Sequence, residues 1–402
     1  MVNDKKVASC AKAPPLWIFA LAVFFAVSMN RDWQSIRLIW YGSIAFVAIS
    51  YLIAFNGKFI LSRTSYWKWM LSFAALGAIS LLWSIFATVV FDILKTYVVF
   101  FIVLFLVQCS LEYKFSIDTL LNIYFFATIV NALYIVLVID LEQLGEIQLG
   151  VGVIEGWNGN GIGFMMAQGA LIGCYLMQKS RSRFSKFFYL ISAVALSLLA
   201  VYTGSRTAFI MMVAGFILYY SFTHPTKLIR NIAIFAGGIL LALYLVMEID
   251  AFYAVLGYRL EGLWALFTGE GEADSSASIR QIFIDNGMKW FSENPIIGIG
   301  LNNYKVLNQG ATGRFTYAHN NFVELAVDLG IVGFALYYFA YAYLIVRLLK
   351  VIKNNPFNSM LLAALVSSLL SHYGTVSYYD FYQNLLLLLC FYVVDKTKKE
   401  IG

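Results

Sequence analysis

The chain has 402 residues, of which 61% are hydrophobic, 17% aromatic and only 12% charged. Soluble domains carry about 25% charged residues, so this composition excludes an ordinary soluble enzyme and a disordered protein. The net charge of +6 comes from Lys and Arg in short clusters at the ends of apolar segments, which argues against a nucleic-acid partner. We therefore expect a polytopic membrane protein.

Apolar segments recur along the whole chain. A transmembrane helix needs roughly 20 apolar residues, and fewer where neighbouring helices shield its ends. The first such run follows Lys5, Lys6 and Lys12, but no small-x-small cleavage site follows it, so it indicates an anchor rather than a signal peptide. The fold class is therefore an all-α integral membrane protein with about 12 transmembrane helices, in a single domain over residues 1–402. The predicted spans are residues 16–30, 38–55, 70–90, 92–110, 119–140, 161–178, 187–204, 207–221, 231–248, 319–347, 357–373 and 381–395.

Basic residues are distributed unevenly between the loops. If both termini are cytoplasmic, most of the Lys and Arg residues lie on the inner side, as the positive-inside rule requires. The remaining arginines lie on the outer side, where this rule does not account for them, and are therefore informative about function. The four cysteines, at positions 10, 109, 174 and 390, show no CxxC and no paired spacing, so we expect neither a disulfide nor a metal site.

One long outer loop, residues 249–318, separates the ninth and tenth spans. Long loops on a rigid scaffold are usually functional. From Ser276 to Glu293, apolar residues recur near helical spacing, and Pro295 follows as a stop. This pattern predicts an amphipathic helix that lies on, or dips into, the outer membrane interface. Its apolar positions are Ile279, Ile282, Phe283 and Trp290.

Arginines stand out at two outer positions. Arg206 lies in a tight Gly-Ser turn between the seventh and eighth spans, where an unpaired cation is costly. It either snorkels to lipid phosphate or is a fixed phosphate ligand, and we favour the ligand because the short turn leaves the side chain little freedom. Arg280 lies near the start of the loop helix. Taken alone, an arginine at such a position is most simply interpreted as a solvated residue on the exposed face of the helix.

The entry to the tenth span carries a polar stripe. Asn320, Glu324 and Asp328 fall on one helical face and descend about 12 Å from first to last. Carboxylates at that depth face a partner or a cavity, so they either serve a site or bridge to neighbouring helices. His319 precedes them at the helix N-terminus, where the dipole lowers the imidazole pKa. A neutral imidazole there is a competent general base.

Two other histidines and several missing motifs complete the inventory. His224 lies on the cytoplasmic side and is interfacial, whereas His372, at the outer end of the eleventh span, is either a core histidine or a second site residue. The sequence has no HExxH, Walker A or GxSxG motif, so neither a metal hydrolase nor a nucleotide-sugar transferase is indicated. We expect metal-independent chemistry without a cofactor.

Together these motifs resemble the O-antigen ligase and O-antigen polymerase superfamily of bacterial envelope glycosyltransferases. The most specific match is His319-Asn320 followed by two glycines, which is similar to the family's histidine motif. The further matching segments are Thr203-Gly204-Ser205-Arg206, Ser278-Ile279-Arg280 with Asn294 to Gly300, and the weaker Gly156-Trp157-Asn158-Gly159-Asn160.

The resemblance implies a GT-C-like transferase of the bacterial inner membrane. Its donor would be a glycan on undecaprenyl pyrophosphate, used at the periplasmic face without metal and with inversion. Arg206 and Arg280 would bind the pyrophosphate, and His319 would deprotonate the acceptor hydroxyl. Besides the lipid-linked glycan, membrane lipids and a chain-length regulator are candidate partners. The candidate substrate-binding residues are Asn160, Arg314, Tyr317, Asn320, Glu324 and His372.

Three functions remain open on this resemblance. The sequence around His319 and from Asn294 to Tyr304 is more similar to the polymerase branch, in which a growing chain is transferred to the next lipid-linked repeat unit. The alternative is a ligase, which transfers the glycan to lipid A-core. A flippase or other transporter would need ionisable groups near the bilayer midplane, and Glu324 and Asp328 keep this third class open.

Overall fold

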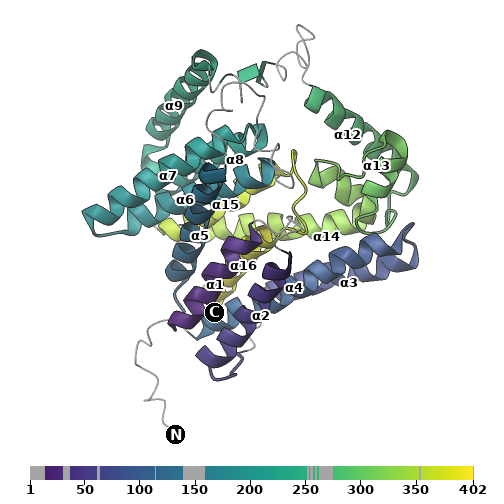
Figure 1. Ribbon diagram of the computed structural model, residues 1–402, viewed down its shortest axis with the longest axis horizontal. Coiled ribbons are helices and arrows are strands. Elements are labelled where there is room, and N and C mark those ends of the chain that lie inside the picture. The colour runs from purple at the N-terminus through teal and green to yellow at the C-terminus, as the bar shows by residue number, and fades with distance from the viewer. Residues whose placement is uncertain are drawn as a thin grey trace.

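A computed structural model describes residues 14–29, 37–60, 64–113, 115–138, 159–250, 253, 257–258, 260–261, 275–352 and 355–401. Within these residues the chain is helical and contains fourteen α-helices (Figure 1). The N-terminal lysines, Cys10, and the Trp157 and Asn158 positions of the asparagine motif lie outside the described residues, as does most of the outer loop before the amphipathic helix.

Each predicted span corresponds to one helix, and the outer loop adds two more. Among the described residues, six helices could cross a membrane by length and composition: α2, α4, α5, α7, α8 and α14. The apolar segments of α1, α15 and Ala236–Glu248 in α9 are shorter. The chain is a multi-pass membrane protein, and the number of spans stays a prediction. The bounds are α1 Pro15–Ser28, α2 Arg37–Ala54, α3 Ser65–Ile79, α4 Ala87–Glu112, α5 Ile117–Val138, α6 Gly159–Lys179, α7 Arg183–Tyr202, α8 Arg206–Thr223, α9 Leu228–Glu248, α12 Ser275–Glu293, α13 Tyr304–Thr312, α14 Asn321–Val351, α15 Pro356–Ser371 and α16 Phe381–Ile401.

The predicted boundary between the third and fourth spans is wrong. The apolar run suggested a helix to residue 90, but α3 ends at Ile79, a 3-10 turn follows over Ser80–Leu82, and α4 begins at Ala87. The intervening turn is held from outside by the outer loop: Phe86 N donates to Asn303 Oδ1 (2.8 Å), and Ile85 N donates to Ile299 O (3.3 Å). A tertiary contact therefore overrides the local hydrophobic pattern.

Helix α14 is broken where the outer loop docks on it. Gly330 has φ 62° and ψ −166°, a conformation that L side chains rarely adopt. Four backbone groups on either side of the break pair with the segment that follows α12, so these groups do not need lipid as a partner. These hydrogen bonds run from Ile299 N to Val327 O (3.1 Å), Gly300 N to Asp328 O (2.9 Å), Ile331 N to Pro295 O (2.9 Å) and Val332 N to Ile296 O (3.2 Å).

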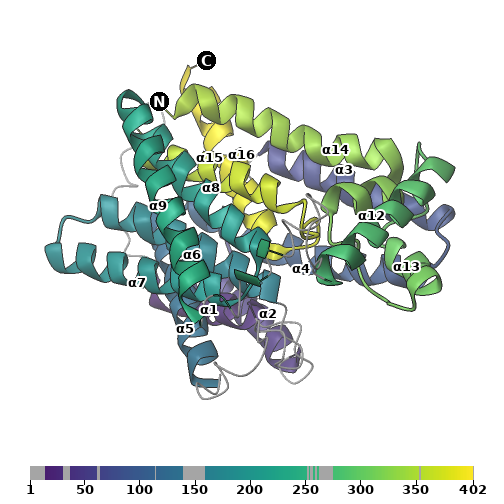
Figure 2. The ribbon, with the colours of Figure 1, turned by 90° about the horizontal axis from the view of Figure 1, so that it is seen from above.

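The predicted amphipathic helix forms as α12. Its Phe283 is buried in a small core with Tyr304 of α13 and with Val323 and Val327 of α14, whereas Ile282 is half exposed. In both ribbon views α12 and α13 lie together at one end of the molecule, and α7 reaches the opposite end (Figures 1 and 2). The helix thus docks on α14, and its relation to the membrane interface stays a prediction.

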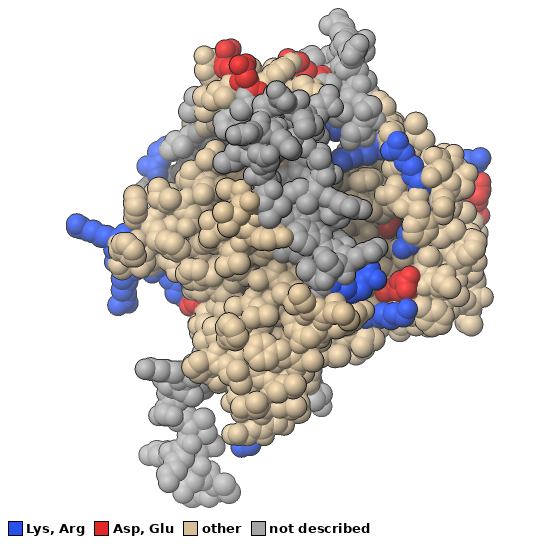
Figure 3. Space-filling view, viewed as in Figure 1, with Lys and Arg blue, Asp and Glu red and all other residues tan. Residues whose placement is uncertain are grey.

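Charge is sparse between these two ends. Figure 3 shows a face that is largely uncharged, with Lys and Arg at its left edge, over the end of α7, and again in a hollow on the other side. An uncharged belt between charged ends is the arrangement expected of a membrane protein, because unpaired charges are unfavourable in hydrocarbon.

Candidate active site

A cavity of about 330 Å³ lies among α5, α6, α8 and the loop that joins α15 to α16. Tyr317, two residues before His319, forms part of its wall. Aromatic rings interleaved with hydroxyl, amide and carboxylate groups make a lining that suits a polar ring-shaped ligand. The aromatic and polar lining residues are Tyr124, Phe164, Tyr317, Tyr379, Tyr382, Gln168, Gln383, Ser371, Thr375, Ser377 and Asp380.

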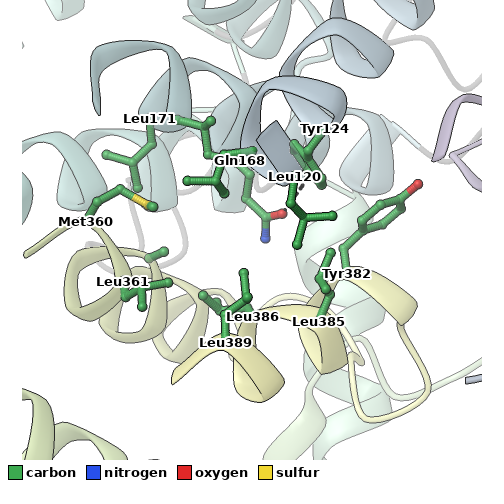
Figure 4. A pocket seen from close by; sticks show the side chains of 13 residues that line it. Leu120, Tyr124, Gln168, Leu171, Met360, Leu361, Tyr382, Leu385, Leu386 and Leu389 are labelled. Atoms are coloured by element: carbon green, nitrogen blue, oxygen red, sulfur yellow. Dashed lines mark hydrogen bonds between the residues drawn. The ribbon is translucent and has the colours of Figure 1, made fainter. Parts of the chain in front are cut away.

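A second, smaller cavity of about 50 Å³ adjoins the first and shares Tyr124, Gln168 and Tyr382 with it. Its other walls are apolar side chains of α5, α6, α15 and α16, which face one another in Figure 4. Gln168 accepts a hydrogen bond from the Tyr124 hydroxyl (2.8 Å), so it sets the boundary between the polar and the apolar space.

The Arg206 turn is fixed by its own side chains. Gly204 has φ 65°, which glycine adopts without strain. Ser205 caps α8 by accepting from Ala208 N (3.2 Å), and its hydroxyl donates to Asn160 Oδ1 (2.6 Å). Arg206 is therefore the first residue of α8, at the positive end of the helix dipole, where anions are stabilised. Asn160 thus lies at this turn, and its substrate-binding role stays a prediction.

His319 has an unusual environment. Its backbone is in the left-handed region, with φ 52°, and its Nδ1 is buried with no hydrogen-bond partner among the described residues. The ring lies against Tyr317, with centroids 4.1 Å apart. Burial, followed by the positive charge of Arg280, lowers the pKa of His319 to about 3. The direction agrees with the sequence-based expectation, but the cause is burial and Arg280 rather than the helix dipole.

The polar stripe on α14 holds the outer loop. Asn320 is the N-cap, and its Oδ1 accepts from Phe322 N (3.0 Å) and Val323 N (3.2 Å). Glu324 accepts from Ala318 N (2.7 Å). None of the stripe residues lines the described cavity. Of the two roles that the sequence left open, their contacts support a bridge to neighbouring segments rather than a place in the site.

Asp328 makes the larger share of this bridge. Its carboxylate accepts from Asn302 N (2.6 Å) and Tyr304 N (2.8 Å). The hydroxyl of Tyr378 donates to Asp328 (3.2 Å) and lies 3.4 Å from Glu324. The two acids therefore join α14, the outer loop and the α15–α16 loop at one point.

His372 lies in the core. Its side chain is fully buried, and its Nε2 lies 2.7 Å from the Ser377 hydroxyl, while its Nδ1 lies 3.3 Å from the Tyr338 hydroxyl. It reaches the cavity indirectly, through Ser377 and, by way of the Tyr341 hydroxyl, through Gln383. Arg314 is exposed on the segment between α13 and Tyr317 and does not line the cavity. The substrate-binding roles of both residues stay predictions.

The sequence analysis missed the wall formed by the α15–α16 loop. Asp380 caps α16 by accepting from Gln383 N (2.8 Å), and both residues face the cavity. The available signal was the polar, tyrosine-rich segment between the last two spans, Ser371 to Asp380, together with Gln168 inside an apolar span. Neither this segment nor Gln168 belongs to a known motif. They become site candidates only because they share a cavity wall with Tyr317.

Comparison with known proteins gives one family. Residues 191–338 match the family model for O-antigen ligase. The matched region contains Arg206, Arg280 and His319, but not α5, α6 or the α15–α16 loop, which supply most of the cavity wall. No curated protein matches the chain.

Proposed function

Because the chain carries an O-antigen ligase family domain over residues 191–338, and this family comprises membrane enzymes that transfer lipid-linked glycans, we propose that it is an O-antigen polymerase. It takes a glycan from undecaprenyl pyrophosphate and transfers it to the next lipid-linked repeat unit. The reaction takes place at the periplasmic face of the bacterial inner membrane. The observation that carries this proposal is the state of His319.

His319 acts as the general base. Its ring is neutral because burial and Arg280 disfavour the imidazolium, and its Nδ1 has no hydrogen-bond partner among the described residues. A buried polar atom without a partner is rare in folded proteins and is a mark of functional positions. Once donor binding raises its pKa, this nitrogen accepts the proton of an acceptor hydroxyl, a role worth about 10²- to 10⁴-fold in rate.

The arginines bind the leaving group. The acceptor oxygen forms a bond to C1 of the donor sugar as the bond from C1 to the phosphate oxygen breaks, and the electron pair leaves with the pyrophosphate. The guanidinium groups of Arg206 and Arg280 stabilise that charge. Attack opposite the leaving group inverts the anomeric centre.

Donor binding also adjusts the base. Arg280 lowers the proton affinity of His319. When the pyrophosphate binds Arg280, its negative charge offsets this effect and raises the pKa of His319. The base therefore becomes stronger only when the donor is in place.

A second candidate function is O-antigen ligase, in which the acceptor is lipid A-core. The match of residues 191–338 to the O-antigen ligase family favours it. Both functions use the same residues and the same donor, and they differ only in the acceptor.

The test is the lipopolysaccharide profile of a deletion strain complemented with wild type, His319→Ala or His224→Ala. We expect wild type and His224→Ala to restore long chains and His319→Ala to fail at an equal membrane level. A core with one repeat unit in the deletion strain supports the polymerase, whereas bare core with long chains on undecaprenyl pyrophosphate supports the ligase. Full restoration by His319→Ala contradicts the assignment of the base.

A further inference from the structure

The polar cavity continues into the small apolar one. Tyr124, Gln168 and Tyr382 line both, so the space of about 330 Å³ meets the space of about 50 Å³ at these three side chains. The polar cavity also reaches Tyr317, whose ring contacts His319. The remaining walls of the apolar cavity are Leu, Ile, Met and Ala side chains (Figure 4). A ligand that fills both spaces therefore has a polar body and a small apolar end.

The junction of the two cavities lies well inside the helix bundle. Asn160, at the start of α6, accepts a hydrogen bond from Ser205 of the Arg206 turn (2.6 Å). Gln168 follows on the same helix, about 12 Å further along its axis at 1.5 Å per residue. Beyond Gln168, α6 gives only apolar side chains to the small cavity. A glycan at the turn thus reaches the junction with a ring or substituent that points inward along α6.

Gln168 supplies a hydrogen-bond donor at this junction. Its Oε1 accepts from the Tyr124 hydroxyl (2.8 Å), which fixes the orientation of the amide. Its nitrogen has no hydrogen-bond partner among the described residues, and in Figure 4 it points across the apolar cavity toward α16. A half-buried amide nitrogen is stabilised when it meets a carbonyl oxygen, so the apolar end of the ligand carries an acceptor.

The small cavity sets the size of that end. One water-sized group needs about 10–15 Å³ of such space, so a cavity of about 50 Å³ holds roughly three or four of them. An acetyl group has three non-hydrogen atoms, of which one is a carbonyl oxygen and one a methyl carbon. It therefore matches both the volume and the single donor.

We propose that the two cavities together bind an acetamido sugar, an N-acetylhexosamine of the glycan. The inference rests on the proposed function and names a sugar class in its substrate. The ring lies in the polar cavity, where tyrosine rings cover its apolar faces and polar side chains bind its hydroxyls. The acetyl carbonyl accepts from Gln168 Nε2, and the methyl group enters the apolar cavity.

Other sugar classes fit this pair of cavities less well. A uronic acid brings a carboxylate, but no Lys or Arg lines either cavity and Asp380 already faces the larger one. A 6-deoxyhexose offers only a methyl group, which leaves most of the apolar cavity empty and the nitrogen of Gln168 without an acceptor. A plain hexose would place a hydroxyl among apolar walls, which is unfavourable.

The first test enlarges the apolar cavity. Leu389→Ala removes a side chain that lines it, whereas Leu388→Ala makes the same change at a buried position of α16 that does not. Transfer is measured with the native lipid-linked repeat unit, de-N-acetylated and then re-acylated with acetyl or butanoyl groups. We expect wild type and Leu388→Ala to show a KM about tenfold higher for the butanoyl substrate, and Leu389→Ala to remove most of this difference.

The second test removes the amide donor. Gln168→Leu keeps the approximate size of the side chain, and Gln178→Leu makes the same change on the same helix outside both cavities. We expect Gln168→Leu to raise the KM for the N-acetyl substrate about tenfold and Gln178→Leu to leave it unchanged. Equal effects of the two variants would contradict the hydrogen bond to the acetyl group.

The third test needs no transfer. The same repeat unit, re-acylated with a diazirine-bearing acyl group, is irradiated with Leu389→Ala, and the attachment site is found by peptide mass mapping. We expect attachment to the walls of the apolar cavity, such as Met360 of α15, and much less of it in Leu388→Ala. Attachment to the α12–α13 region instead, or equal attachment in both variants, would overturn the acetamido pocket.

The two proposals fail in different ways. If wild type transfers no repeat unit to another, the proposed function is wrong, and the cross-link still decides the pocket. If transfer proceeds but the length of the acyl group has no effect on the KM in wild type, the pocket is wrong and the function stands. Efficient transfer of a native repeat unit that contains no acetamido sugar would also overturn the pocket alone.

Discussion

His319 joins three features at one residue: a left-handed backbone, a buried nitrogen without a hydrogen-bond partner among the described residues, and a neutral ring at ordinary pH. Each is unfavourable by itself, and a left-handed non-glycine residue persists only where its surroundings hold it. Glu324 provides part of that support, because its carboxylate binds the backbone of Ala318. Glu324 of the predicted stripe thus helps to hold the backbone next to His319, the proposed base.

The pKa of His319 gives the first prediction. It is about 3 in the folded chain and about 6.5 in an unfolded one, so between these values the unfolded chain binds more protons. The contribution of His319 to stability is therefore fully present above pH 6.5 and is lost as the pH falls toward 3. We expect its ring to stay neutral at pH 5, and Arg280→Gln to raise its pKa.

NMR of ¹⁵N-histidine protein in detergent measures this directly, because the chain has only three histidines. His319→Gln identifies the signal, and Lys289→Gln, on the same helix α12, serves as the control for Arg280→Gln. A His319 ring that titrates near pH 6.5 would contradict the burial argument. An unchanged pKa in Arg280→Gln would contradict the charge coupling.

At the scale of elements, the break in α14 and the loop that fills it depend on each other. Gly330 cannot take a side chain there, because a Cβ would lie 2.3 Å from the backbone of Ile296. The sequence pattern predicted one continuous tenth span, since apolar periodicity does not show which backbone groups a distant segment will bind. The same reason explains the wrong boundary between α3 and α4.

The second prediction concerns this break. Gly330→Ala introduces left-handed backbone strain of about 1–2 kcal/mol and overpacking of about 1–3 kcal/mol. We therefore expect the free energy of unfolding to fall by roughly 2 kcal/mol or more. Gly310→Ala, in α13 with nothing within 4 Å of its Cβ, should be neutral or stabilising by up to about 1 kcal/mol. The fraction of soluble protein after heating in detergent measures both. Equal heat resistance of the two variants would contradict the packing of this segment against α14.

On the scale of the whole molecule, the candidate cavity is assembled from distant parts of the chain. The family match covers Arg206, Arg280 and His319, but α5, α6 and the α15–α16 loop close the cavity. For the proposed reaction at the periplasmic face, we predict that α12 and α13 lie at the outer end and the α6–α7 turn at the inner end. The asymmetry of Lys and Arg predicts that orientation.

The third prediction tests the orientation with two matched serines. Ser292 at the end of α12 and Ser182 before α7 are both exposed. A membrane-impermeant maleimide applied to intact spheroplasts should label Ser292→Cys at once and Ser182→Cys only after permeabilisation. The parent protein measures the background from its natural cysteines. Labelling of both variants from outside, or the reverse order, would overturn the predicted topology.

The sequence determined the helical membrane fold, the positions of most helices, and the two arginines and the histidine on which the proposal rests. These follow from hydrophobic runs and from polar groups at membrane depth, which are properties of consecutive residues. Only the tertiary structure decided that Asn320, Glu324 and His372 bind within the chain, that the cavity wall includes Asp380 and Gln383, and that α14 is broken. These features depend on contacts between segments far apart in the chain, which local patterns do not encode.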